Sequence, residues 1–317
     1  MNPKRTFGLL AAIVICFGMV DLTFAKEGAQ KAILVTGASS GIGRNIAETL
    51  ASQGHLVYAG ARNKEDLEEL NAIDNVIGVR LDVTKQEDIE AVVEMISNEG
   101  TGLYALINNA GVASSGQLTK TPDSDLQFVF NVNVAGVLRV TRAFAPMIIQ
   151  SQGRIVSMGS IAGIYSSATN GVYSMSKHAM EAFADSLAAE LEPQGVSVSI
   201  LEPGPYKTKI WSTTTVRVMN NMKAAGMTPS EEQRKMVENI AKRVRTMKEP
   251  DEVSEAVVHA LFSAEPLRRY LVVPEERYAR STIRKSLEEL VQLNQWGPYS
   301  YSRDELVKML DEVLAEL

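Results

Sequence analysis

Runs rich in apolar residues alternate with amphipathic stretches from residue 30 to residue 275. Short runs of this kind are typical of strands buried on both faces of a parallel sheet. They lie at residues 32–36, 55–59, 75–81, 103–107, 154–158, 196–201 and 269–273. Between them apolar residues recur at helical spacing, as at Ala179, Phe183, Leu187 and Leu191. The alternation predicts the α/β class: one doubly wound parallel sheet of the Rossmann type, in a single domain, with helices on both faces.

An apolar segment precedes this predicted domain. Lys4 and Arg5 come before the apolar run 7–20, and the less apolar residues 21–25 follow it. The fourteen residues of the run would reach only about 21 Å as a helix, less than the roughly 30 Å of a hydrocarbon core. Residues 1–25 therefore resemble either a signal peptide or an uncleaved N-terminal membrane anchor.

The carboxyl-terminal segment, residues 276–317, is predicted to be a helical extension. Residues 282–293 and 303–317 each carry an amphipathic pattern, and Ser302 with Glu305 forms a capping-box motif at the start of the second helix. Three roles fit such helices: covering a substrate cleft, contacting a second subunit or touching a membrane. The pattern does not choose among them.

Composition narrows the function classes. The chain has 317 residues, of which 45% are hydrophobic and 22% charged, and its net charge is -6. No strongly basic patch is present, so nucleic acid is not an expected partner. Cys16 is the single cysteine and the three histidines are scattered, so neither an intrachain disulfide nor a metal-ligand motif is predicted.

The first predicted strand leads into a glycine-rich turn. A strand, such a turn and a helix start together form the context of a dinucleotide site. The glycines let the backbone approach a pyrophosphate, and the free N–H groups at the helix start attract that anion. The candidate cofactor-binding residues of this turn are Gly37, Ser39, Ser40, Gly41, Ile42 and Gly43.

A second candidate group follows the predicted strand 154–158. Tyr173 and Lys177 are four residues apart in a predicted helix, which places both side chains on one face. A close cation favours the phenolate, so Lys177 is expected to lower the pKa of Tyr173 from its ordinary value of about 10. Such a phenol can exchange a proton with a substrate oxygen, and Ser160, just past the strand, can hydrogen-bond the same oxygen. The Tyr-Lys pair alone is a weak signal, because this spacing is common on exposed helices.

Taken with the glycine-rich turn, this group resembles the short-chain dehydrogenase/reductase family. The spacing from Ser160 to Tyr173 and Lys177 matches the family's Ser…Tyr-x-x-x-Lys pattern, and residues 37–43 match its Gly-x-x-x-Gly-x-Gly turn. The resemblance covers about residues 30–275 and implies a sheet of seven strands. Gly-Pro-Tyr-Lys-Thr at 204–208 looks like hydroxysteroid and retinol dehydrogenase-type members.

The resemblance also implies roles for residues that no local pattern singles out. In the family, one group of positions lies along the adenosine, an asparagine is catalytic and supports a proton relay through the lysine, and a threonine binds the nicotinamide carboxamide. The positions that match in this chain are Asp82, Val83 and Asn109 for the adenosine side, Asn133 for the relay and Thr208 for the carboxamide. For Asp82 an alternative reading is that it only caps a turn.

The end of the second predicted strand bears on the choice of cofactor. An NAD site usually has a carboxylate there, which holds the ribose hydroxyls. Here the strand ends in Gly60-Ala61-Arg62 without a carboxylate, and a guanidinium suits a 2′-phosphate. The predicted cofactor is therefore NADP rather than NAD, bound through Arg62. The alternative is that Arg62 is a surface arginine without a ligand.

These patterns and the resemblance predict a reversible hydride transfer between NADP(H) and an alcohol/ketone pair, with Asn133, Ser160, Tyr173 and Lys177 catalytic. The subfamily resemblance and the methionine-rich segment 211–248 favour a bulky apolar substrate of steroid, retinoid or lipid type, although helix packing explains that segment equally well. One rival is a nucleotide-sugar epimerase or dehydratase on the same fold, whose usual Gly-x-x-Gly-x-x-Gly turn is not present. The other is a non-catalytic NADP-binding regulator, which usually lacks the Tyr or the Lys.

The implied cofactor bears on location. An exported enzyme would meet little dissolved nicotinamide cofactor, so membrane association through residues 7–25 is preferred, and export after signal-peptide cleavage is the alternative. A homo-oligomer is compatible with these patterns, which do not specify one.

Overall fold

The computed structural model describes residues 30–316 except 225, 227 and 229. The chain divides into residues 1–30 and residues 31–317, and the second unit is the one described below. The predicted signal peptide or anchor (1–25), with its apolar residues 7–25, and Met227 lie outside the described residues.

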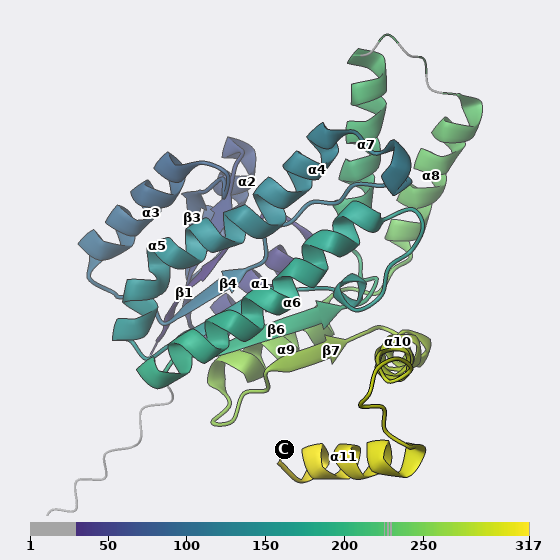
Figure 1. The fold of residues 1–317 in the computed structure, drawn as a ribbon. Coiled ribbons are helices and arrows are strands. Elements are labelled where there is room, and N and C mark those ends of the chain that lie inside the picture. Colours follow the sequence, from purple (N-terminus) through teal and green to yellow (C-terminus); the bar gives the residue numbers. More distant parts are fainter. Residues whose placement is uncertain (1–29, 225, 227, 229, 317) are drawn as a thin grey trace, which may run out of the picture. The chain divides into compact units, whose positions relative to one another are not determined.

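A seven-stranded sheet runs through the second unit in the order β3-β2-β1-β4-β5-β6-β7 (Figure 1). The strands are β1 (Ala32–Val35), β2 (Leu56–Ala61), β3 (Val76–Arg80), β4 (Ala105–Asn108), β5 (Arg154–Met158), β6 (Ser197–Pro203) and β7 (Arg269–Val272). All neighbouring strands are parallel. The predicted doubly wound sheet is confirmed, and each strand boundary lies within two residues of its apolar run.

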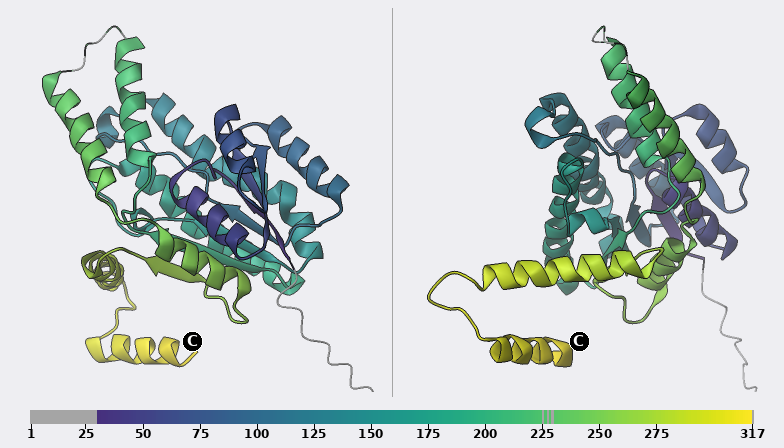
Figure 2. Two further views of the ribbon diagram at one scale, coloured as in Figure 1. Left: turned by 180° about the vertical axis from the view of Figure 1, so that it is seen from behind. Right: turned by 90° about the vertical axis from the view of Figure 1, so that its right-hand side faces the viewer.

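Helices cover both faces of the sheet (Figure 2). The α-helices are α1 (Gly41–Ser52), α2 (Lys64–Asn71), α3 (Gln86–Glu99), α4 (Asp123–Phe130), α5 (Val137–Gln150), α6 (Gly171–Leu191), α7 (Ile210–Ala224), α8 (Glu231–Arg245), α9 (Asp251–Phe262), α10 (Glu276–Leu293) and α11 (Arg303–Glu316). Short helical turns are η1 (Leu118–Lys120), the π-helical η2 (Asn131–Gly136), η3 (Ile161–Gly163) and η4 (Glu192–Gln194). Helices α1 and α9 pack on one face, and α3, α5 and α6 pack on the other.

Successive residues of β1 enter two different cores, because side chains alternate across a strand. Ile33 packs with Ile46 of α1 and Val257 of α9. Leu34 packs with Phe144 of α5 on the opposite face. All five side chains are fully buried. Both faces of the sheet are therefore sealed, and polar loops are left at the carboxyl ends of the strands.

The strand order reverses beside β1, which lies between β2 and β4. In a doubly wound sheet such a reversal opens a crevice at the carboxyl ends of the strands, because the connections on its two sides run in opposite directions. The loops after β1, β4, β5 and β6 all leave the sheet at this edge. This is where the candidate residues of the sequence analysis are expected to meet.

One helical segment of the described chain is long and apolar enough to cross a membrane, judged by length and composition alone. It is Asp123–Gln150, which comprises α4, η2 and α5. A core helix passes the same test, and Val140, Phe144 and Ile148 of this segment are buried against the sheet.

The carboxyl-terminal helices confirm one expectation and extend another. The N–H and the hydroxyl of Ser302 both donate to Glu305 Oε2 at 2.7 Å, so the predicted capping box forms at the start of α11. Helix α10 begins at Glu276, six residues before the expected start at 282. Its first residues, 276–281, are mostly polar, so the amphipathic pattern did not extend to them.

Candidate active site

The turn between β1 and α1 is held by Asn109, which follows β4. Its Nδ2 donates to the carbonyl oxygens of Thr36 (2.9 Å) and Gly37 (3.0 Å). Gly37 and Gly41 have φ of +66° and +59°, the left-handed region that favours glycine. The side chain of Ser40, which precedes α1, makes no cap hydrogen bond. The first N–H groups of α1 are therefore not taken up by a side-chain cap, as an anion site at a helix start requires.

Residues at the ends of β2 and β3 line the same cavity as this turn: Arg62, Asp82 and Val83. The amide (2.9 Å) and hydroxyl (2.7 Å) of Thr84 donate to Asp82 Oδ1, so Asp82 also caps its turn. Burial acts to raise the pKa of Asp82, but the Thr84 hydrogen bonds and the Arg62 charge hold it below its ordinary value. Asp66, in the first turn of α2, lines this end as well. A carboxylate is thus present one helical turn beyond the strand end at which an NAD site usually has one.

Ser160 and Tyr173 meet beside the end of β5. Ser160 Oγ accepts the N–H of Ala162 (3.1 Å) at the start of η3. The Ser160 hydroxyl lies near enough to the Tyr173 phenol to act on its pKa. Tyr173, in the first turn of α6, is 8% exposed and packs edge-on against Trp211 with ring centroids 5.7 Å apart. The two candidate hydroxyls therefore lie together between β5 and α6.

Lys177 lies one turn beyond Tyr173 on α6 and is also buried. Its Nζ donates to Met158 O (2.7 Å) and lies 5.7 Å from the centroid of the Tyr173 ring. Burial lowers the pKa of Lys177 to about 8. Burial also raises the pKa of Tyr173 to about 12, although the Ser160 hydrogen bond opposes the change. The expected lowering of the Tyr173 pKa is therefore wrong for this arrangement, because desolvation of the phenol dominates and the ammonium is directed to Met158.

Asn133 lies in the π-helical turn η2, and its amide is fully engaged. Oδ1 accepts the N–H of Val112 (2.8 Å), and Nδ2 donates to Val112 O (2.8 Å) and Ser176 Oγ (3.0 Å). A Cβ on Gly111 would lie 3.6 Å from Asn133 Oδ1 and 3.9 Å from Lys177 Nζ, so both groups flank this glycine. The Asn133 side chain braces the segment after β4, and it does not line the cavity.

The loop after β6 lies beside the glycine-rich turn. Thr208 Oγ1 accepts the N–H of Ile210 (3.1 Å) at the start of α7. A Cβ on Gly41 would lie only 3.2 Å from Thr208 Cβ. The residue that the family resemblance assigns to the nicotinamide carboxamide is therefore a neighbour of the turn expected to hold the pyrophosphate.

A cavity of about 900 Å³ joins these segments, at the upper end of the roughly 300–1,000 Å³ of ligand sites. Of the fifteen candidate residues, Gly41 and Asn133 do not line it. The thirteen that do are Gly37, Ser39, Ser40, Ile42, Gly43, Arg62, Asp82, Val83, Asn109, Ser160, Tyr173, Lys177 and Thr208. The uncapped start of α1 and the glycines around it fit a pyrophosphate.

Helices α7 and α8 supply many of the cavity's apolar side chains. From the segment 211–248, Trp211, Met236 and Met247 line the cavity, together with Ile240 and Val244. Met236 is 58% exposed, so it is not packed into the core.

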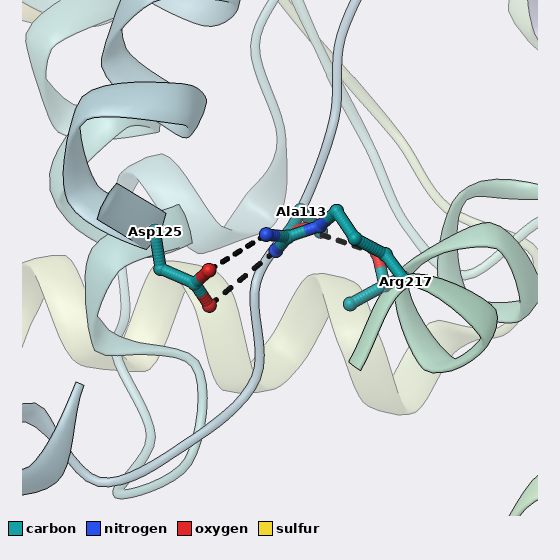
Figure 3. A network of polar contacts seen from close by, with 4 residues as sticks. Ala113, Asp125 and Arg217 are labelled. Atoms are coloured by element: carbon teal, nitrogen blue, oxygen red, sulfur yellow. Dashed lines mark hydrogen bonds and ion pairs between the residues drawn. The ribbon is translucent and has the colours of Figure 1, made fainter. Parts of the chain in front are cut away.

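An ion pair fixes α7 against α4 at this wall of the cavity (Figure 3). Arg217 Nη1 donates to Asp125 Oδ1 (2.7 Å), and Nη2 lies 3.4 Å from both Asp125 Oδ2 and Ala113 O. The guanidinium lies over the Phe128 ring, 4.5 Å from its centroid. Because Asp125 is buried, this contact is less screened by water than a surface ion pair.

Several residues that line the cavity were not predicted from the sequence, because they belong to no motif. They are Asp66, Phe128, Tyr165, Arg217 and Tyr278. Tyr278 lies in the first turn of α10, so the carboxyl-terminal extension contributes to the cavity wall. An expected helix start at residue 276, instead of 282, would have placed Tyr278 in the first turn of this helix.

A parallel sheet with a dinucleotide turn after β1, and a Ser–Tyr–Lys group lining the same cavity, defines a nicotinamide-dependent oxidoreductase. A family model described as short chain dehydrogenase matches residues 31–218. The chain is 34% identical over 260 residues to retinol dehydrogenase 16 of Rattus norvegicus, covering 76% of this chain and 80% of the relative. It is 31% identical over 268 residues to the mitochondrial D-beta-hydroxybutyrate dehydrogenase of Mus musculus, covering 78% of each.

A solved structure shows the same fold. It is a short chain dehydrogenase/reductase from Burkholderia phymatum in complex with NAD, with a TM-score of 0.71, 28% identity and coverage of 86% of this chain and 98% of that one. The chain therefore belongs to the short-chain dehydrogenase family and is an NAD(P)-dependent oxidoreductase acting on alcohols or ketones, as the sequence resemblance implied.

Proposed function

We propose that this enzyme transfers hydride reversibly between NADP(H) and a bulky apolar alcohol/ketone pair. The observation that carries the proposal is the single cavity lined by the glycine-rich turn and by Ser160, Tyr173 and Lys177. When bound, the nicotinamide supplies the hydride chemistry. The protein positions the reactants and handles the proton.

The glycine-rich turn and the start of α1 would hold the pyrophosphate, with Asn109 keeping the turn closed through its bonds to Thr36 and Gly37. Asp82 and Val83 would lie along the adenosine. Thr208, beside Gly41, would hold the nicotinamide end.

Ser160 and Tyr173 would hold the substrate oxygen, and Tyr173 would pass the proton. With a pKa of about 12, the Tyr173 phenol is protonated at neutral pH, which is the acid form that ketone reduction needs. Lys177 would hold the nicotinamide ribose and supply positive charge beside the phenol. Asn133 would support the relay by bracing the segment that carries Gly111 against Lys177.

Arg62→Ala is expected to weaken NADP(H) binding by about 10- to 150-fold, the equivalent of about 1.5–3 kcal/mol for a lost hydrogen bond to a charged group. Binding of NAD(H) should not weaken, because NAD(H) has no 2′-phosphate. The measurement is a titration of both cofactors on each variant. Lys64→Ala is the matched control, since Lys64 is an exposed cation two residues away that does not line the cavity. Unchanged preference for NADP in Arg62→Ala would remove Arg62 from the proposal. A parent enzyme that prefers NAD would assign the site to Asp66 instead.

The proposed substrate class is supported by the apolar wall of α7 and α8 and by Tyr278. The names of the relatives, a retinol and a D-beta-hydroxybutyrate dehydrogenase, span a bulky apolar alcohol and a small hydroxy acid. The test is NADPH oxidation against steroid, retinoid, sphingoid-base and fatty carbonyls, with 3-oxobutanoate as the small polar comparison. We expect the highest kcat/KM among the bulky apolar carbonyls. Turnover of 3-oxobutanoate alone would contradict the proposed substrate class.

We also propose that residues 30–275 form the catalytic domain and residues 276–317 its helical extension, and that residues 7–25 attach the enzyme to a membrane. The support for attachment is the apolar run together with the cofactor requirement. Export after cleavage is the alternative. Washing membranes with alkaline carbonate separates the two, because a cleaved soluble form leaves the membrane.

A further inference from the structure

The face of α6 that carries Tyr173 and Lys177 continues with two acidic residues at the same spacing. Tyr173, Lys177, Glu181 and Asp185 follow one another at intervals of four, so they form one stripe along the helix. Glu181 is thus the next side chain beyond Lys177, on the side away from the phenol. No motif of the family resemblance includes it.

Glu181 is enclosed by the turn that begins at Ser160. A Cβ on Gly163, the last residue of η3, would lie 2.8 Å from Glu181 Oε1 and 3.0 Å from Lys177 O. No side chain therefore fits between η3 and this part of α6. Neither carboxyl oxygen of Glu181 is exposed.

The second carboxyl group comes from the neighbouring strand. Glu202, near the end of β6, is 3% exposed. It lies next to β5, the strand that ends before Ser160, because Met158 of β5 pairs with Leu201 of β6. Within the described chain, neither Oε atom of Glu181 accepts a hydrogen bond, and neither does Oε1 of Glu202. One proton on the pair would supply a donor between the two carboxyl groups.

One arginine lies within ion-pair distance of both carboxyl groups. Arg269 of β7 places Nε 3.4 Å from Glu181 Oε2 and 3.7 Å from Glu202 Oε1. Its Nη2 is already bound to Asp185 at 2.7 Å. The charged groups facing Glu181 in the described structure are thus Lys177 and Asp185 from α6, Glu202 from β6 and Arg269 from β7, while η3 contributes only the glycine. The single positive charge of Arg269 does not balance three ionised carboxylates. A proton on the buried pair reduces the excess negative charge.

Electrostatics agrees with this geometry. Burial, together with the charge of Glu202, raises the pKa of Glu181 to about 8 against the opposing pull of Arg269. Burial lowers the pKa of Lys177 to about 8, and the charge of Glu181 opposes that change. Glu181 and Lys177 therefore titrate in the same pH range. As pH rises, Glu181 gains negative charge where Lys177 would otherwise lose its proton.

We propose that Glu181 and Glu202 form a carboxyl pair that shares one proton behind the catalytic lysine, and that Glu181 is the positioning residue that keeps the Lys177 ammonium charged. The inference rests on the proposed function of Lys177. The pair loses its shared proton to solvent as pH rises, and no other bond changes. Activity then persists to higher pH than a lone buried lysine would allow.

The test compares three amide variants across pH 6 to about 10, up to the ordinary pKa of lysine. Glu181→Gln removes the buried charge, so the alkaline limb of kcat/KM should move about one pH unit lower, which is about tenfold less activity above the limb. Glu202→Gln leaves Glu181 without its like-charged partner, so Glu181 ionises at lower pH. That limb should stay in place or move to higher pH. Glu190→Gln, an exposed position on the same helix, should match the parent.

Two further readouts do not depend on turnover. The Kd for NADP(H) should follow the same pH dependence as kcat/KM, since Lys177 would hold the ribose. The Lys177 side chain, followed by NMR in the cofactor-free full-length protein, should titrate at lower pH in Glu181→Gln than in Glu202→Gln. Melting temperatures show whether each variant folds. Glu181→Asp keeps the charge, so its alkaline limb of kcat/KM should lie between the limbs of Glu181→Gln and the parent.

The outcomes separate the two proposals. A Tyr173→Phe variant that keeps the parent rate defeats the proposed function, whatever Glu181 does. If Tyr173→Phe is inactive, one result overturns the inference: in Glu181→Gln, neither the alkaline limb of kcat/KM nor the titration of Lys177 moves from its position in the parent. It is also overturned if Glu181→Gln and Glu202→Gln shift in the same direction, because a general disturbance of the core would then explain both.

Discussion

Tyr173→Phe is expected to lower kcat for ketone reduction about 10²- to 10⁴-fold, the usual contribution of a positioned general acid. The phenol of Tyr173 lines the cavity beside Ser160, where it can donate a proton to the substrate oxygen. The phenylalanine ring keeps the edge-on contact with Trp211 at its 5.7 Å centroid distance. Packing and cofactor binding should therefore survive while the proton donor is lost. The measurement is NADPH oxidation at saturating ketone.

Two controls separate chemistry from folding in this variant. The Kd for NADP(H) and the melting temperature of Tyr173→Phe should equal those of the parent. Tyr299→Phe removes a hydroxyl from a side chain that is 83% exposed, and it should leave every parameter unchanged. A purified Tyr173→Phe protein that turns over a competent ketone at the parent rate would show that another group donates the proton.

The sheet was predictable because its strands are buried on both faces. A strand buried on both sides has a continuous apolar run, such as residues 32–36. Such a run can be recognised without knowing which strands lie next to it. The glycine-rich turn was predictable for a related reason. Gly37 and Gly41 have backbone angles that other residues rarely adopt, so their spacing marks the turn directly.

The substrate side of the cavity was not predictable to the same extent. Its wall is built from α7, α8 and the first turn of α10, whose residues meet only in three dimensions. The Arg217–Asp125 pair joins residues 92 positions apart. No periodicity along the chain reports such a contact, because the partner is set by the packing of α7 on α4.

Protonation states were the property of the site that the sequence predicted least well. The four-residue spacing of Tyr173 and Lys177 indicates that they share a face, and it says nothing about how deeply they are buried. Burial reverses the expected direction of the Tyr173 pKa and lowers that of Lys177. Glu181 and Glu202 come from separate elements, so their pairing depends on the register of β5 and β6.

Gly43→Ala is expected to weaken NADP(H) binding at least about tenfold, or roughly 1.4 kcal/mol. A Cβ at this position would overlap Asn109 Nδ2 and Gly37 O. These are the two atoms whose 3.0 Å hydrogen bond closes the glycine-rich turn. The overlap cannot be relieved by rotating the amide alone, since Nδ2 also donates to Thr36 O. Forcing extra atoms into a packed site usually costs about 1–3 kcal/mol, and here the distortion falls on the proposed pyrophosphate site.

Gly100→Ala is the matched control for this prediction. Gly100 ends α3 at φ +68° with nothing within 4 Å of an added Cβ, so the variant carries backbone strain of about 1–2 kcal/mol and no contact. Its melting temperature should fall while its Kd for NADP(H) stays at the parent value. Loss of cofactor in both glycine variants would point to general destabilisation. Parent-like binding by Gly43→Ala would show that the turn after β1 does not hold the pyrophosphate, because that turn cannot keep its closed shape around a methyl group.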